Sequence, residues 1–275
     1  LYSSAASDVY KRQSYQWAGQ DSVVVCDLSL LKDTVDLPFS FFLKDFQIIK
    51  LDNRDEAMVG ENNLCVSENY ILVYGSVYEL HPCRLFTKKG EFVTNIGAIG
   101  QGPGEYRAVY KAEIDEKHNC IYLMPFDNSN AIYVYDLAGK PLRSIPLHQS
   151  VSKAVFKVDA DKRELTVGAL PFTGYPFVAW VQDFEGHLLD SVPAARHLSV
   201  LPDYSNEVMY GANTEVFDLY ISTFFELRPD TLYHYIRSES RLKPRFTLNI
   251  GDRKRSITTF LSLIHISEPT RHAQI

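Results

Sequence analysis

IYVYDLAGKPLRSIP, the stretch Ile132–Pro146, occurs in related form at two other places in the chain. The related stretches are Cys83–Gly97 (CRLFTKKGEFVTNIG) and Ala179–Pro193 (AWVQDFEGHLLDSVP). Each has glycine at its eighth position, so these glycines lie 49 and 47 residues apart. A glycine between two short, mainly apolar stretches is typical of a β-hairpin. The shared residues are Gly90, Gly139 and Gly186 at position eight, Leu85, Val134 and Val181 at position three, Val93, Leu142 and Leu189 at position eleven, and Ile96, Ile145 and Val192 at position fourteen.

The spacing of these hairpins predicts a β-propeller, because a repeat of about 40–50 residues that contains only strands is typical of a propeller blade. Strand patterns place the first three blades at Asn63–Ile96, Ala112–Pro146 and Val155–Val192, and a more divergent fourth at Glu207–Ile250. A closed propeller of this kind most often has six blades. We therefore expect an all-β chain that holds about four blades of a truncated six-bladed propeller.

Two predicted strands lie at the outer edges of these blades. Phe46–Leu51 is predicted as an outer strand that leads into the first blade, and Pro141–Pro146 as the last strand of the second.

Both ends of the chain are expected to be non-native. Ser3–Gln13 (SSAASDVYKRQ) is what a common transposase-based sequencing adapter encodes, and Leu261–Arg271 (LSLIHISEPTR) is what the adapter of the opposite end encodes. Residues 1–13 and 261–275 are therefore predicted to be adapter-derived. Residues 14–260 are predicted to form a single incomplete propeller domain, a fragment of a longer gene in a metagenomic library insert.

The composition disfavours several classes of function. With 34 acidic and 28 basic residues the formal net charge is −6, which argues against a nucleic-acid-binding protein. No apolar run reaches the ~18 residues of a membrane-spanning helix, so no transmembrane segment is expected. No metal site and no cofactor are predicted, and the cysteines lack ligand spacing. The cysteines are expected to be small buried residues, with a cross-blade disulfide as the alternative. They are Cys26, Cys65, Cys83 and Cys120.

The segment between the first two blades, Gly97–Tyr106 (GAIGQGPGEY), is the one distinctive motif. It is rich in glycine, but it lacks the GxxxxGK[ST] pattern and no helix pattern follows, which argues against a phosphate-binding loop. Pro103–Gly104 suits the centre of a type II turn, since proline presets φ and glycine accepts a positive φ.

This loop is expected to cross one face of the propeller and to deliver residues near the mouth of the central channel. Propeller ligands usually bind there, so the loop supplies the candidate ligand-binding residues. Alternatively, Glu105 and Tyr106 lock neighbouring blades together by hydrogen bonding and packing. The candidate ligand-binding residues are Gln101, Glu105, Tyr106 and Arg107.

The chain resembles a bacterial family of six-bladed β-propellers that are secreted or lipid-anchored and often described as domains of unknown function. The matching stretches, in the same order, are Ile48–Gly60, Leu85–Tyr106 with its GQGPGEY motif, and Asp230–Gly251. The resemblance implies a six-bladed propeller, a periplasmic, cell-surface or extracellular location and a binding or scaffold role. The family has no established catalytic residues to carry over.

Two functions remain open at this point. The first is an exported binding or interaction module for a glycan, a small molecule or a protein partner. The second is a metal-dependent propeller enzyme of the lactonase or lyase type, which needs carboxylate and histidine ligands that converge on one ion. A serine hydrolase is disfavoured because no GxSxG motif occurs. Candidates for the metal-dependent enzyme are Glu105, Asp115, Asp127, His148 and His197.

Overall fold

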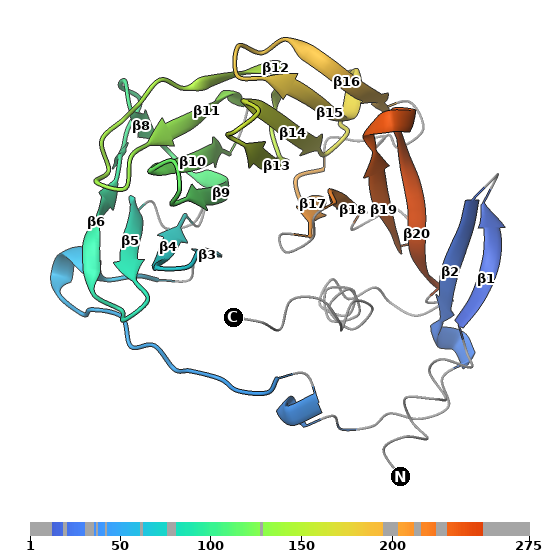
Figure 1. Ribbon diagram of the computed structural model, residues 1–275, viewed down its shortest axis with the longest axis horizontal. Coiled ribbons are helices and arrows are strands. Elements are labelled where there is room, and N and C mark those ends of the chain that lie inside the picture. Colours follow the sequence, from blue (N-terminus) through green and yellow to red (C-terminus); the bar gives the residue numbers. More distant parts are fainter. Residues whose placement is uncertain are drawn as a thin grey trace. The chain divides into compact units, whose positions relative to one another are not determined.

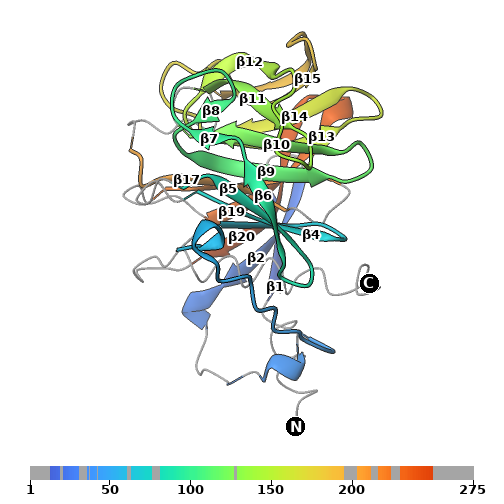
Figure 2. The same ribbon diagram turned by 90° about the vertical axis from the view of Figure 1, so that its left-hand side faces the viewer.

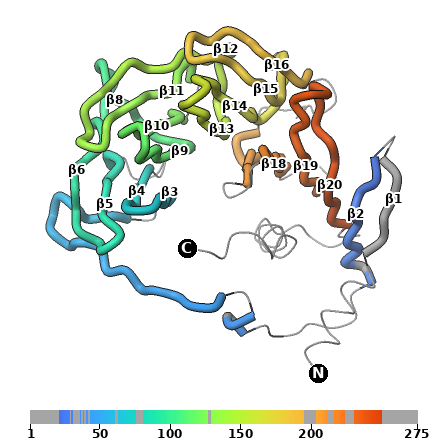
Figure 3. Tube along the Cα trace, in the orientation of Figure 1, coloured from blue at the N-terminus to red at the C-terminus, as the bar shows by residue number. Residues whose placement is uncertain are grey.

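The computed structural model describes residues 13–18, 21–30, 36, 38–41, 43–60, 63–75, 81–126, 129–194, 203–211, 216–223 and 230–249. These residues fall into two compact units, which are described separately: Ile48–Pro202, and Leu1–Gln47 together with Asp203–Ile275. Figure 3 follows the chain through both units. Apart from Gln13, which begins a strand, the two ends predicted to be adapter-derived lie outside the described residues.

The unit Ile48–Pro202 contains three four-stranded antiparallel sheets (Figure 1). In each sheet the strands pair in chain order, so every sheet is a simple meander. The strands are β3 (Asn63–Val66), β4 (Tyr70–Tyr74), β5 (Cys83–Thr87) and β6 (Phe92–Ile96) in the first sheet, β9 (Val109–Asp115), β10 (Cys120–Pro125), β11 (Ser129–Tyr135) and β12 (Ile145–Val151) in the second, and β13 (Ala154–Asp159), β14 (Glu164–Ala169), β15 (Phe177–Asp183) and β16 (Leu188–Pro193) in the third.

These three sheets correspond to the first three predicted blades, but two predicted outer strands are wrong. Phe46–Leu51 forms no strand. In the second sheet the last strand is β12, at Ile145–Val151, and not Pro141–Pro146. Pro141 has no N–H to donate to a ladder and makes only an isolated bridge with Tyr135.

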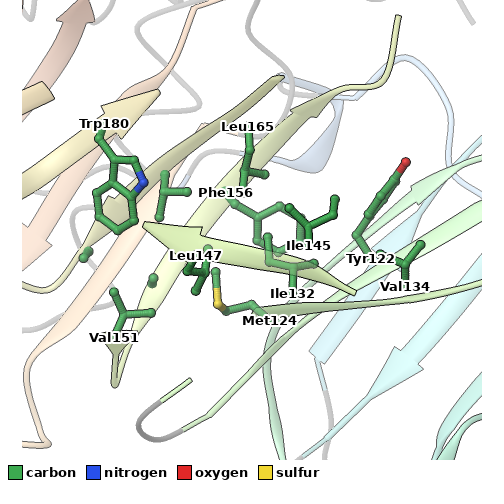
Figure 4. Close-up of a cluster of buried hydrophobic side chains, with 13 residues drawn as sticks. Tyr122, Met124, Ile132, Val134, Ile145, Leu147, Val151, Phe156, Leu165 and Trp180 are labelled. Atoms are coloured by element: carbon green, nitrogen blue, oxygen red, sulfur yellow. The ribbon is translucent and has the colours of Figure 1, made fainter. Parts of the chain in front are cut away.

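Consecutive sheets pack face to face, and the cores lie between them. One core joins the first and second sheets around Leu85 and Leu123, both with no exposed surface. Another joins the second and third, where Figure 4 shows Phe156 and Trp180 of the third sheet facing the side chains of the second. The first strands of the sheets also contact one another, β3 with β9 and β9 with β13. This serial stacking of four-stranded meanders is the arrangement of propeller blades.

The hairpin glycines hold each sheet close to the segment that precedes it. At Gly139, where φ is +83°, an added Cβ would overlap the carbonyl oxygen of Asn95 in β6. Gly90 stands in the same relation to the carbonyl oxygen of Lys50. The segment around Lys50 therefore occupies the place that β6 occupies for the second sheet, although it forms no ladder.

The open face of the first sheet is partly covered by this preceding segment. Ile49, Leu51 and Val59 pack on a cluster around Phe86, which has no exposed surface. The cover includes a 3-10 turn, η3 (Asp55–Ala57). At the first strand, Leu64 and Val66 of β3 remain 59% and 55% exposed.

The other unit holds a six-stranded sheet in the order β1-β2-β20-β19-β18-β17. Its last four strands in the chain form an antiparallel meander in the region of the predicted fourth blade. The sequence patterns missed that β2 joins β20 in parallel, where Arg241 donates to the carboxylate of Asp21. The strands are β1 (Gln13–Ala18), β2 (Asp21–Asp27), β17 (Glu207–Tyr210), β18 (Asp218–Ser222), β19 (Asp230–Ile236) and β20 (Arg241–Asn249).

The described chain is all-β apart from short 3-10 turns. Within it, no helix has the length and apolar character needed to cross a bilayer. The four cysteines are free, and burial raises the pKa of Cys83 to about 11. This confirms the expectation of small apolar residues for Cys83, which has no exposed surface, while the other three are half-buried.

Candidate functional site

The glycine-rich loop leaves β6 and forms a small parallel ladder of its own, β7 (Ala98–Ile99) with β8 (Glu105–Tyr106). The N–H of Glu105 donates to the carbonyl oxygen of Gly102 at 3.1 Å, and Gly104 has φ of +75°. These are the features of a type II turn with Pro103–Gly104 at its centre. The turn predicted from the sequence is therefore confirmed.

Tyr106 is buried and joins the loop to the first two sheets. Its hydroxyl donates to the carbonyl oxygen of Ile96 and accepts the backbone N–H of Cys83 at 2.7 Å. Its ring meets that of Tyr135 edge to face, with the centroids 6.3 Å apart. The hydroxyl of Tyr135 donates in turn to the carbonyl oxygen of Gly104 at 3.1 Å. Burial raises the pKa of Tyr106, so the phenol stays protonated and remains a donor.

Glu105 explains the glycine at position 100 of the loop. Its carboxylate folds back over the loop and accepts the N–H of Gly102 at 2.8 Å through Oε2. An added Cβ at Gly100 would overlap that same oxygen. The loop thus supports the half-buried carboxylate of Glu105. A phosphate-binding loop differs in that its backbone N–H groups are open to a ligand.

A groove of about 380 Å³ separates this turn from the outer strands of the second sheet. Figure 2 shows β7 and β8 beside β11 and β12, and Gly104 lies next to Pro141. The turn therefore rests on the outer strands of its blade. We call this the loop groove; it is lined by Gly102, Pro103, Gly104, Glu105, Tyr133, Val134, Tyr135, Pro141, Leu142 and Ser144.

The loop groove lies beside a break in the outer ladder of the second sheet. All three sheets shift register at position eleven of the hairpin repeat, where Val93, Leu142 and Leu189 are 41%, 43% and 46% exposed. In the first and third sheets the ladder resumes at the next residue, Thr94 or Asp190. In the second sheet it resumes only at Ile145. Between Pro141 and Ile145 no residue pairs regularly with β11, although the N–H of Leu142 still donates to the carbonyl oxygen of Val134 at 2.7 Å. This irregular segment lines the groove.

The four predicted ligand-binding residues have different surroundings. Glu105 lines the loop groove, and Tyr106 lies beneath the loop with its hydroxyl already bonded on both sides. Gln101 and Arg107 are exposed, and neither is a lining residue of the groove. Their assignment to ligand binding stays a prediction. The sequence patterns missed Tyr133, Leu142 and Ser144; no motif marks them, although Pro141 in a predicted strand signals irregular pairing.

The candidates for a metal-dependent enzyme do not share a site in the described residues. Asp115 pairs with His118 at 2.7 Å, whereas His148 lies 3.2 Å from the carbonyl oxygen of Gly186. Asp127 and His197 fall outside the described residues. Over the part of the chain that the structure describes, no three His, Cys, Asp or Glu side chains gather as metal ligands would.

A titratable group that the sequence patterns missed lies between the first strands of two sheets. Glu113 of β9 accepts the backbone N–H of Val158 of β13, with 3.2 Å between Oε2 and N. Burial is the main reason that its pKa rises to about 7, although Lys157 and the bond from Val158 oppose the rise. The sequence gives one signal for this group. Glu113 is acidic, whereas the equivalent strand position of the first sheet holds the less polar Cys65.

The serial packing of four-stranded meanders defines this chain as a β-propeller protein. The chain matches the family described as "Domain of unknown function (DUF4934)" over residues 23–262, and it belongs to that family. A comparison with curated proteins finds no match.

Solved structures similar to the chain include a protein of Bacteroides fragilis that is described as exported, at 18% identity and a TM-score of 0.57 over 90% of this chain and 66% of that one. The chain thus spans 66% of that protein's length, and at this identity the likeness concerns the fold. Two weaker matches, each with a TM-score of 0.42 over 66% of this chain, are the WD40 β-propeller domain of Doa1 (12% identity, 51% of that chain) and an auxiliary nutrient binding protein from Bacteroides thetaiotaomicron (16% identity, 40% of that chain).

Proposed function

We propose that the chain is part of an exported β-propeller that binds a ligand in the loop groove. The observation that carries the proposal is the groove itself, which is built from the one distinctive loop and the outer ladder with the longest gap in the three sheets of its unit. At about 380 Å³ it is in the lower range of small-molecule pockets. A small molecule or one or two units of a glycan fit this volume better than an extended protein surface.

The lining has the mixed chemistry that such a ligand needs. Glu105 offers a carboxylate whose Oε2 is oriented by Gly102, and Tyr133 and Ser144 add hydroxyl groups. Pro141 and Leu142 provide an apolar wall. Carbohydrates place hydroxyl groups against polar side chains and C–H faces against rings and apolar groups, so a neutral saccharide matches this lining.

The proposal includes six blades in the full-length protein and an extracytoplasmic location, either secreted or lipid-anchored. The likeness to an exported protein that is about a third longer than this chain supports both ideas. Gln101 and Arg107, which flank the turn at the surface, are proposed to contact parts of the ligand that extend beyond the groove.

The experiment is a titration of isotope-labelled protein with maltohexaose, cellohexaose and xylohexaose, followed by amide chemical shifts. We expect saturable shifts centred on Glu105, Tyr133 and Ser144 with at least one sugar. Glu105→Gln keeps an acceptor for Gly102 and should weaken binding about tenfold by removing a charged acceptor. Glu91→Gln, on the exposed hairpin turn of the first sheet, is the matched control and should have no effect. Shifts that are absent, or that survive Glu105→Gln unchanged, would refute the loop groove as the site.

A further inference from the structure

A second pocket lies on the third-sheet side of the same irregular segment, and its chemistry differs from that of the loop groove. Its volume is about 110 Å³, several times the ~30 Å³ that one water molecule occupies in the liquid. Two arginines and only one acidic residue line it. We call it the arginine pocket; its lining residues are Arg143, Ser144, Ile145, Arg163, Phe184 and Glu185.

Arg163 is held in place by the turns of the third sheet. Its guanidinium lies over the ring of Phe184 at 5.1 Å from the centroid, and it pairs with Glu185 at 2.7 Å. The N–H of Phe184 donates to the backbone oxygen of Arg163 at 3.1 Å. The backbone of Arg163 has φ of +55°, a conformation that residues other than glycine rarely adopt. Stacking on an aromatic ring leaves the N–H edge of a guanidinium available to an acceptor.

Arg143 lines the pocket from the irregular segment between Pro141 and Ile145 of the second sheet. It is exposed, and its side chain makes no hydrogen bond or ion pair with any residue that the structure describes. The residue at the same place in the third sheet, Asp190, lies in a regular ladder opposite Val181. Arg143 differs from Asp190 in that it has no paired residue in the neighbouring strand.

We infer that the arginine pocket binds an oxyanion, namely the carboxylate, sulfate or phosphate group of a small ligand. Two arginines and one glutamate give the lining a net charge of +1, in a chain whose formal net charge is −6. The planar N–H fork of arginine matches two oxygens of such a group, and a bond between two charged groups is stronger than a neutral one. This site does not rest on the proposed function of the loop groove, which lies on the opposite side of residues 142–144.

The test is a titration of the labelled protein with inorganic phosphate, sodium sulfate and sodium glucuronate, with glucose as the uncharged counterpart of glucuronate. Side-chain Nε–H signals of Arg143 and Arg163 report occupancy directly. We expect saturable shifts at both arginines, with Kd on the order of 1 mM and weaker binding as salt rises. If glucuronate binds more tightly than the inorganic ions, the ligand of the arginine pocket is the carboxylate of a saccharide. If phosphate or sulfate binds more tightly, the ligand is a free tetrahedral anion. Equal shifts with glucose would overturn the inference.

Two charge changes in opposite directions make the test specific. Arg143→Gln should weaken anion binding about tenfold, because one charge-assisted hydrogen bond is lost. Glu185→Gln should strengthen it several-fold, because the carboxylate that competes for Arg163 is removed. Lys140→Gln removes the same charge from the neighbouring turn without touching the lining and should have little effect. Equal weakening by Arg143→Gln and Lys140→Gln would show only a general attraction to positive charge and would overturn the site. Circular dichroism checks that each variant is folded.

Discussion

The carboxylate of Glu113 in β9 accepts the backbone N–H of Val158 in β13, and so joins the first strands of two consecutive sheets. Cys65 holds the same place in the first sheet, since it pairs with Leu72 as Glu113 pairs with Tyr122. The sulfur of Cys65 accepts the N–H of the next first strand in the same way, at Ile114. In the first two sheets, one position of the repeat thus caps the free edge of the following sheet, with a different side chain in each.

Glu113 makes stability depend on pH between about 4.5 and 7. Its pKa rises from 4.5 to about 7 on folding, so the protonated form is favoured in the folded state. The stabilisation is complete below the unfolded pKa and is lost as pH rises through 7, by up to about 3 kcal/mol. The neighbouring charges also act on the pKa of Glu113: Lys157 and Lys111 lower it, and Asp115 raises it.

Glu113→Gln keeps an acceptor for Val158 and removes the titration. We expect urea unfolding to show similar stability for the variant and the parent at pH 4.5, and a more stable variant at pH 8. An identical pH dependence of the two proteins would contradict the buried position of this carboxyl group.

The hydroxyl of Tyr106 is predicted to stabilise the junction of the first two sheets. Tyr106→Phe leaves the N–H of Cys83 and the carbonyl oxygen of Ile96 without this partner in a buried place, at a cost of about 1–3 kcal/mol. Tyr133→Phe is the control, because the hydroxyl of Tyr133 makes no hydrogen bond within the described part of the chain. Its free energy of unfolding should change by less than about 0.5 kcal/mol. Equal losses for the two variants would disprove the specific role of Tyr106.

Gly139 is predicted to be required for contact between sheets as well as for its turn. Gly139→Ala introduces a strained φ of +83° and also a clash with Asn95, whereas Gly174→Ala has a similar φ of +95° and nothing within 4 Å. The second substitution should cost about 1 kcal/mol from backbone strain alone. The first should cost at least about 2 kcal/mol more, since neighbouring backbone has to move. Thermal unfolding of the two variants measures the difference, and equal midpoints would mean that the sheets are not in contact there.

Positions three and eleven of the hairpin repeat are predicted to differ strongly in energy although both are apolar. Leu85, at position three, has no exposed surface, and Leu85→Ala should cost about 2–5 kcal/mol. Leu189, at position eleven, is 46% exposed, and Leu189→Ala should change stability by less than about 1 kcal/mol. Chemical denaturation of both variants checks this pair. A large loss for Leu189→Ala would place that side chain in a core that the structure does not show.

Local chemistry alone determined a large part of this protein. Turn glycines at nearly constant spacing and alternating apolar stretches predicted the three meanders, and Pro103–Gly104 predicted its turn. Both predictions worked because hairpins and turns depend on residues that are neighbours in the chain. The sequence also indicated the loop that carries Glu105 and Tyr106. It offered two roles for this loop, which are ligand binding and the joining of neighbouring blades.

The tertiary structure decided what the repeat left open. Leu142 has the same apolar character as Val134, but the register shift turns position eleven outward and keeps position three buried. The long gap in the ladder before Ile145 then opens one groove beside Glu105 and another beside Arg143 and Arg163. Such features depend on how strands far apart in the sequence pair and pack, and a single-residue shift in register moves a side chain from one face to the other.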